Sequence, residues 1–267
     1  MHPSWVSEVG KEVIRSYVAL GDSFTEGLND PYGTDVYRGW ADRLAEHLDA
    51  ASPGLLYANL AVRGKVLRQV AAEQVPKAVA MNADLYTISA GGNDMIRPGA
   101  DPDALAVVYR DALAALRKTG ARVVVFTGFD PKYRGLNGRA SDGRFRGKVA
   151  TFNMHIRSIA DRLGLTVVDL WSMPVLNADP AWHEDRLHLT PEGHARLAHA
   201  VAERLGVPVE GDWRAPWPVL PVKTRQEALR DDLYWARTYF APWVQRRIKG
   251  VSSGDGRTPK RPELKPL

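Results

Sequence analysis

Five short apolar runs divide the first part of the chain, and amphipathic stretches separate them. The runs lie at residues 17–20, 55–60, 84–90, 122–127 and 166–170, and valine, leucine, isoleucine and tyrosine are frequent in them. Strands that are apolar along their whole length are buried on both faces, as in a parallel sheet covered by helices. The alternation therefore predicts an α/β fold: a three-layer α/β/α sandwich around a five-stranded parallel flavodoxin-like sheet, followed by a C-terminal helical extension.

The composition of the chain changes after residue 205. We expect residues 1–205 to form one α/β domain. Residues 206–249 are predicted to be an extended segment followed by an amphipathic helix that packs on or near the core. Residues 250–267 are rich in glycine, serine, proline and lysine, so we expect a disordered basic tail.

The C-terminal helix is expected from residue 224 to residue 240. A stripe on this helix, formed by Leu229, Leu233, Ala236 and Phe240, gives it an apolar side. Pro242 is expected to end or kink the helix, because proline removes a hydrogen bond and its ring collides with the preceding turn.

Charge and cysteine content exclude several classes of protein. The chain has no cysteine, which excludes disulfides, zinc–cysteine sites and thiol catalysis. Its formal net charge is +5, and the whole excess falls in residues 206–267, so the basic character belongs to an appendage. We expect no nucleic-acid partner. The first sixteen residues lack the apolar core of a leader and no stretch has the length of a membrane span, so we expect a cytoplasmic protein without an integral membrane segment.

The first apolar run ends in Gly21-Asp22-Ser23-Phe24. Ligands of open parallel sheets bind outside the carboxyl ends of the strands, so Ser23 is a candidate nucleophile. A serine hydroxyl needs a base, a group that orients the base, and donors for an oxyanion. Gly-Asp-Ser is commonly just a turn, and only its place at a strand end favours catalysis. We expect Asp22 to support the loop by hydrogen bonds rather than to act as a second acid.

His188 is the candidate for the base, and Asp185 is the candidate for the group that orients it. They follow the fifth run, and a spacing of three lets the carboxylate fold back onto the imidazole, which would fix its tautomer. Gly64 and Asn93 follow the second and third runs. With the backbone N–H of Ser23, they would provide three donors for an oxyanion.

These residues resemble, in order and spacing, the four signature blocks of the SGNH hydrolases, also called GDSL esterases or lipases. The blocks are Gly21-Asp22-Ser23, Gly64, Gly92-Asn93-Asp94 and Asp185-Arg186-Leu187-His188. The resemblance implies that Ser23 is the nucleophile and that Asp185 and His188 complete a triad. It also implies an oxyanion hole formed by the amides of Ser23 and Gly64 and the side chain of Asn93. The resemblance covers about residues 15–205, and Phe24 stands where the family often has leucine.

Three other patterns are weaker. Residues 250–254 fit the G-x-S-x-G motif, but no strand precedes them, so we expect a linker. His194 and His199 lie five apart and point to different faces of a helix, so we expect them to be solvated or partly packed and to bind no metal. Residues 91–94 lack the lysine of a phosphate-binding loop, and we expect no cofactor.

We therefore expect a serine hydrolase of the esterase or lipase type that cleaves small-molecule carboxylic esters through an acyl-enzyme. A carbohydrate deacetylase, an acyl thioesterase or an acyltransferase could use the same machinery. A non-catalytic binding protein is the alternative from another class. Residues 128–147 and 171–184 are expected to shape the pocket. The C-terminal helix is expected to pack on its own domain, with peripheral membrane contact as the alternative.

Overall fold

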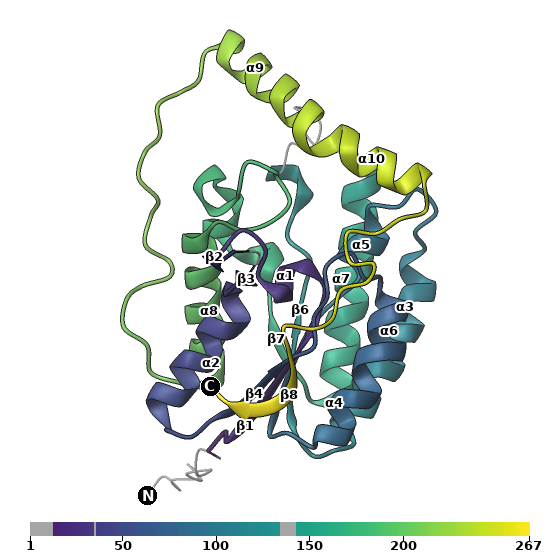
Figure 1. Cartoon of the computed structure of the whole chain (residues 1–267), viewed down its shortest axis with the longest axis vertical. Coiled ribbons are helices and arrows are strands. Elements are labelled where there is room, and N and C mark those ends of the chain that lie inside the picture. The colour runs from purple at the N-terminus through teal and green to yellow at the C-terminus, as the bar shows by residue number, and fades with distance from the viewer. Residues whose placement is uncertain (1–12, 35, 134–142) are drawn as a thin grey trace, which may run out of the picture.

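A six-stranded sheet forms the centre of the molecule in a computed structural model, which describes residues 13–34, 36–133 and 143–267 (Figure 1). The spatial order of the strands is β7-β6-β5-β1-β4-β8. The first five of these are parallel, and β8 is antiparallel to β4. The strands are β1 (Ser16–Gly21), β4 (Leu56–Asn59), β5 (Leu85–Ser89), β6 (Arg122–Phe126), β7 (Thr166–Val168) and β8 (Arg261–Pro266).

The five parallel strands are the five predicted apolar runs. Numbered along the chain, their order in the sheet is 2-1-3-4-5, which is the flavodoxin-like order. In this order the connections change direction at β1, so the crevice beside the carboxyl end of β1 is the expected ligand site. The predicted fold class is confirmed, with one strand more than expected.

Helices cover both faces of the sheet (Figure 1). One face packs against α2 (Gly39–Ala51) and α8 (Pro191–Leu205). The opposite face packs against α4 (Val75–Met81), α6 (Pro102–Arg117) and α7 (Gly143–Leu163). Shorter elements connect these layers: α1 (Ser23–Glu26), β2 (Pro31–Gly33), β3 (Val36–Tyr37), α3 (Leu67–Gln69), α5 (Gly92–Met95), η2 (Pro131–Tyr133), η3 (Leu170–Ser172), η4 (Pro174–Asn177) and η5 (Asp179–Ala181).

Two long helices contain a wide turn just before a proline. The π-helical turn η1 (Val70–Gln74) precedes Pro76, and η6 (Ala236–Phe240) precedes Pro242. Proline has no N–H, and its ring collides with the carbonyl four residues earlier, so a wider turn lets the helix continue. The C-terminal helix therefore runs from α9 (Arg225–Trp235) through η6 into α10 (Ala241–Ile248). The predicted end of the helix at residue 240 is therefore wrong. Of the two effects expected of Pro242, the first does not occur, since the helix continues to Ile248.

Residues 128–147, which we expect to shape the pocket, are partly helical. Helix α7 begins at Gly143. Residues 134–142 lie outside the described part of the chain. Helix α8 has a capped start, because the Thr190 hydroxyl accepts from Gly193 N at 3.2 Å and Pro191 occupies the first helical position.

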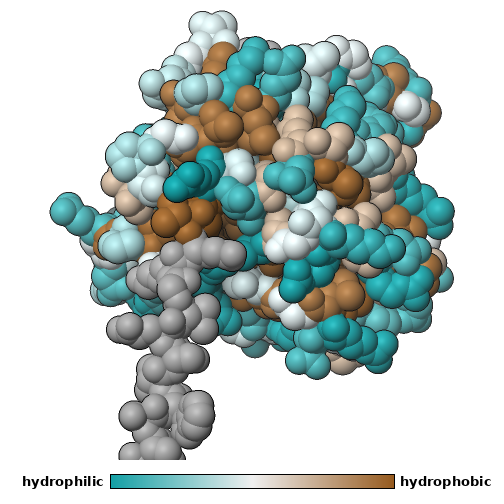
Figure 2. Space-filling model, turned by 90° about the horizontal axis from the view of Figure 1, so that it is seen from below, coloured by the Kyte–Doolittle hydropathy of each residue, from teal (hydrophilic) through white to brown (hydrophobic). Residues whose placement is uncertain are grey.

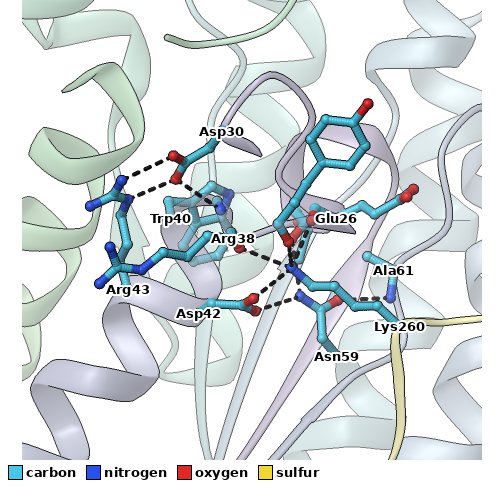
Figure 3. A network of polar contacts seen from close by, with 12 residues as sticks. Glu26, Asp30, Arg38, Trp40, Asp42, Arg43, Asn59, Ala61 and Lys260 are labelled. Atoms are coloured by element: carbon cyan, nitrogen blue, oxygen red, sulfur yellow. Dashed lines mark hydrogen bonds and ion pairs between the residues drawn. The ribbon is translucent and has the colours of Figure 1, made fainter. Parts of the chain in front are cut away.

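The C-terminal tail is ordered, in contrast to our expectation for residues 250–267. Strand β8 pairs with β4, with Tyr57 opposite Lys265. Lys260 inserts its ammonium group among four oxygens: the carbonyls of Glu26, Tyr37 and Arg38, at 2.7, 2.7 and 2.9 Å, and Oδ2 of Asp42, at 2.8 Å (Figure 3). Composition indicated disorder because the tail is rich in glycine, serine, proline and lysine. Backbone pairing and one largely buried charge, the Lys260 ammonium, hold it in place instead.

The surface at the end where β1 begins has apolar patches separated by polar residues (Figure 2). Within residues 13–34, 36–133 and 143–267, no helix combines the length and the hydropathy that a membrane crossing requires.

Candidate active site

Ser23 lies at the first position of α1, directly beyond the carboxyl end of β1. Asp22 caps this helix, and its carboxylate accepts from Phe24 N at 3.1 Å. The end of β1 is held by Gln74, whose side-chain amide exchanges two hydrogen bonds of 2.8 Å with the backbone of Gly21. Gln74 comes from the π-helical turn η1, so that wide turn also serves to fix the strand end beside Ser23.

His188 contacts both of its predicted partners. Its Nε2 lies 2.7 Å from Ser23 Oγ, and its Nδ1 lies 2.7 Å from Asp185 Oδ2. The second carboxylate oxygen, Asp185 Oδ1, accepts the backbone N–H groups of Leu187 and His188 at 2.9 and 3.0 Å. Serine, imidazole and carboxylate therefore form one hydrogen-bonded chain, with the imidazole oriented by the loop that carries it.

Asp185 is surrounded by groups that favour its charged form. Burial alone would raise its pKa, but the nearby imidazoles of His183 and His188 outweigh burial and hold the pKa of this carboxyl well below its ordinary value. Asn29 Nδ2 donates to Asp185 Oδ2 at 2.6 Å. Asn29 has a φ of 69°, a left-handed conformation that asparagine tolerates well. Asn29 was not predicted from the sequence, because no local pattern marks it.

Asn93 joins the loops that carry the predicted oxyanion donors. Its Nδ2 donates to Asp22 Oδ2 at 3.1 Å and to the carbonyl of Lys65 at 3.0 Å. Asn93 therefore lies between the Ser23 turn and the Gly64 turn. Both of its amide hydrogens already have acceptors, so donation to a substrate requires that one of these bonds be shared or released.

Gly64 is packed against the C-terminal tail. Its φ is 76°, and a Cβ at this position would collide with the hydroxyl of Ser252. Gly254 approaches the same turn, where a Cβ would collide with the carbonyl of Arg63. The G-x-S-x-G pattern at residues 250–254 thus follows a helix rather than a strand. It covers the Gly64 turn, and the Ser252 hydroxyl accepts from Gly254 N at 3.3 Å.

Asp22 is buried beside Ser23, with 6% of its surface exposed. Burial raises its pKa to about 6, and the hydrogen bond from Phe24 N opposes this rise. Its hydrogen bonds to Phe24 and Asn93 agree with the supporting position that we expected for it.

A cavity of about 130 Å³ opens beside Ser23 and His188. Its wall is mainly apolar and comes from the end of β5, from η2 and from α7. The apolar lining residues include Met95, Ile96, Phe129, Phe145, Val149 and Phe152. An apolar wall of this kind suits a hydrocarbon group of a ligand.

His194 is fully buried, so our expectation that it is solvated or partly packed is wrong. Its Nδ1 accepts from Trp40 N at 3.1 Å, and its Nε2 donates to the Leu28 carbonyl at 3.0 Å. Burial lowers the pKa of His194 to about 4, so the ring is neutral and ties α8 to the start of α2. His199 packs its ring against that of His47, with centroids 4.9 Å apart.

The flavodoxin-like sheet and the polar cluster at its carboxyl edge define a hydrolase of the SGNH type. The chain belongs to the GDSL-like lipase/acylhydrolase family, whose sequence model matches residues 19–196. This membership makes it an ester-cleaving hydrolase. A search of curated proteins found no match.

Solved structures share this fold. The acetylxylan esterase Axe2 from Geobacillus stearothermophilus is similar with a TM-score of 0.59 and 20% identity, over 74% of this chain and 95% of that one. TesA is similar with a TM-score of 0.59 and 22% identity, over 71% and 97%. The psychrotrophic esterase EstA from Pseudoalteromonas sp. is similar with a TM-score of 0.57 and 14% identity, over 72% and 97%. At these identities the similarity shows the fold.

Proposed function

We propose that the chain hydrolyses carboxylic esters through an acyl-enzyme formed on Ser23. The observation that carries this proposal is the continuous chain of contacts from Ser23 Oγ to His188 Nε2 and from His188 Nδ1 to Asp185, each of 2.7 Å. The lowered pKa of Asp185 keeps the carboxylate charged, so it stabilises the imidazolium that forms during the reaction.

The reaction has two halves. Ser23 Oγ forms a bond to the ester carbonyl carbon while its proton passes to His188 Nε2. The tetrahedral intermediate then breaks the bond to the alcohol oxygen, which leaves with the proton from His188. Water attacks the acyl-enzyme, gives a proton to His188, and the acid leaves as Ser23 regains its proton. No cofactor takes part.

The amides of Ser23 and Gly64 and the side chain of Asn93 are the proposed donors to the oxyanion. The first N–H groups of a helix have no partner within that helix, which suits the position of Ser23 at the start of α1. Asp22 and the Lys65 carbonyl orient Asn93 toward the same region.

The apolar cavity supports an ester with a hydrocarbon acyl group as the substrate. The acetylated sugar, thioester and acyl-transfer alternatives use the same attack on a carbonyl. A panel of alkanoyl esters, acetylated xylosides, acyl thioesters and acceptor alcohols separates them. Preference for acetylated sugars would favour the deacetylase alternative.

Covalent labelling tests the proposal directly. A fluorophosphonate probe should label the native chain once. Ser23→Ala should take no label, and its kcat for ester hydrolysis should fall by several orders of magnitude. Ser252→Ala, in the rival serine motif, is the matched control and should label normally. A chain that takes no label would instead support a non-catalytic binding protein.

The C-terminal helix and the segment before it expose many apolar side chains, which favours the expected alternative of peripheral membrane contact. Leu229 and Leu233 of the predicted stripe are 60% and 64% exposed, so this stripe is not the packed side of the helix. Other exposed apolar residues in this region are Val219, Val222, Tyr234 and Ile248. Basic residues accompany them, as in helices that lie on anionic lipid. Sedimentation of Ser23→Ala with anionic and with neutral vesicles tests this contact, and equal recovery in both supernatants would refute it.

A further inference from the structure

The C-terminal helix crosses the edge of the sheet where Ser23 lies, although it falls outside the part of the chain that matches the family (Figure 1). Trp235 is the buried residue of α9, with 8% of its surface exposed. Leu229 and Leu233 of the apolar stripe therefore do not hold the helix on the body. Its contacts with the body include several to one short segment, residues 183–186, which leads into the proposed catalytic His188.

The peptide group between Asp185 and Arg186 is fixed on both sides. Its carbonyl oxygen accepts from Trp235 Nε1 at 3.0 Å, and its N–H donates to the His183 carbonyl at 2.9 Å. Arg186 has a φ of 61°, which is uncommon for a residue other than glycine, asparagine or aspartate. Such a conformation is strained for arginine and persists only where neighbouring contacts impose it.

The same helix also holds the side chains around this peptide. Asp232 pairs with the Arg186 guanidinium at 2.6 Å, and that guanidinium lies 4.9 Å from the centre of a Trp235 ring. Tyr239 donates to Glu184 Oε1 at 2.6 Å. Three successive residues of the loop, Glu184 to Arg186, are thus each bound by the C-terminal helix.

We propose that Trp235 is a positioning residue for the catalytic Asp185. Its indole N–H fixes the direction of the Asp185 carbonyl, and the ring supports the left-handed Arg186. The carboxylate of Asp185 is attached to this peptide, so its distance and angle to His188 depend on it. Displacement by about 1 Å can cost a hundredfold in rate even when the altered residue lies away from the reacting atoms. This inference rests on the proposed roles of Ser23, Asp185 and His188.

Trp235→Phe tests it, because phenylalanine keeps an aromatic ring over Arg186 and removes the N–H donor. We expect the rate of fluorophosphonate labelling and kcat to fall about tenfold, with KM changed by less than about twofold. The low-field proton resonance of His188 Nδ1–H, which reports the bond to Asp185, should weaken or shift. Trp213→Phe is the matched control: Trp213 Nε1 donates to Glu203 at 2.9 Å, and its loss should change none of these quantities.

The results separate two failures. If the native chain labels at Ser23 and Trp235→Phe labels at the same rate with an unchanged proton resonance, Trp235 has no positioning role and the proposed reaction stands. If the native chain takes no label at all, the proposed reaction and this inference both fail.

Should Trp235→Phe unfold, Asp232→Asn is the second variant, because it weakens the contact between Arg186 and the same helix. It should lower the labelling rate about threefold, and an unchanged rate in that variant would overturn the inference.

Discussion

Asn29 donates to Asp185 Oδ2 at 2.6 Å, the same oxygen that faces His188 Nδ1 at 2.7 Å. The carboxylate is therefore held from two directions, by an amide that follows α1 and by the backbone of its own loop. Ser23 begins α1 and Asn29 follows this helix. Asn29 therefore joins the segment of the proposed nucleophile to the loop that carries its base.

Asn29→Ala should lower kcat about ten- to a hundredfold and leave KM nearly unchanged. A hydrogen bond to a charged group is worth about 1.5–3 kcal/mol, and its loss would allow the Asp185 carboxylate to turn away from His188. Steady-state kinetics on a soluble ester measure this. Asn82→Ala is the matched control, because Asn82 is also left-handed, with a φ of 47°, and caps α4. Equal kinetics in both variants would show that Asn29 only shapes its turn.

The buried Asp22 should make stability depend on pH between about 4 and 6. Burial raises its folded pKa from 3.8 to about 6. Its contribution is fully present below the unfolded pKa and is lost as the pH rises through the folded pKa, because the folded chain must then hold a buried charge. From pH 4 to pH 8 the native chain should therefore lose up to about 2.5 kcal/mol of unfolding free energy relative to Asp22→Asn.

Urea unfolding at several pH values measures this difference. Asp22→Asn also changes the hydrogen bonds to Asn93, but this alters the free energy of unfolding equally at every pH. The part of the difference that varies with pH therefore comes from the charge of Asp22. A difference that stays constant from pH 4 to pH 8 would mean that Asp22 titrates at its ordinary pKa in the folded protein.

Lys260→Met should destabilise the protein by about 3–5 kcal/mol, because it leaves Asp42 and three backbone carbonyls without their buried cation. Asp42 also accepts from the Tyr57 hydroxyl at 2.7 Å, so the loss reaches β4. Urea unfolding measures the change, and amide exchange should quicken in β8. Lys265→Met is the control: Lys265 pairs with Glu263 on the exposed surface of the same strand and should matter by less than about 1 kcal/mol. Similar losses in both variants would show that the tail contributes only through strand pairing.

The sequence predicted the five parallel strands because burial on both faces leaves an uninterrupted apolar run. Strand β8 has no such run. It lies at the edge of the sheet, contains Pro262 and Pro266, and pairs with β4 alone, so composition indicated a disordered tail. The burial of His194 could not be predicted either. Helical spacing shows which face of the helix a residue occupies, but not which part of the protein packs against that face.

Strand-end residues of the candidate site could be predicted because each follows its own apolar run. Parallel strands place such ends at one edge of the sheet, whatever their separation along the chain. Asn29 and Trp235 contact Asp185 from 156 and 50 residues away, and neither follows a strand of the main sheet. Only the folded chain reveals contacts of this kind.

The apolar cavity predicts a preference for acyl chains longer than acetyl. Each methylene that moves from water into it should add about 0.8 kcal/mol, or about fourfold in kcat/KM, until the cavity is filled. A series of p-nitrophenyl esters from acetate to decanoate measures the optimum. Phe145→Ala removes part of the wall and should move the optimum to a longer chain. Met154→Ala, on the same helix but 62% exposed, should leave it in place. An optimum at acetate in all three proteins would exclude this cavity as the acyl site.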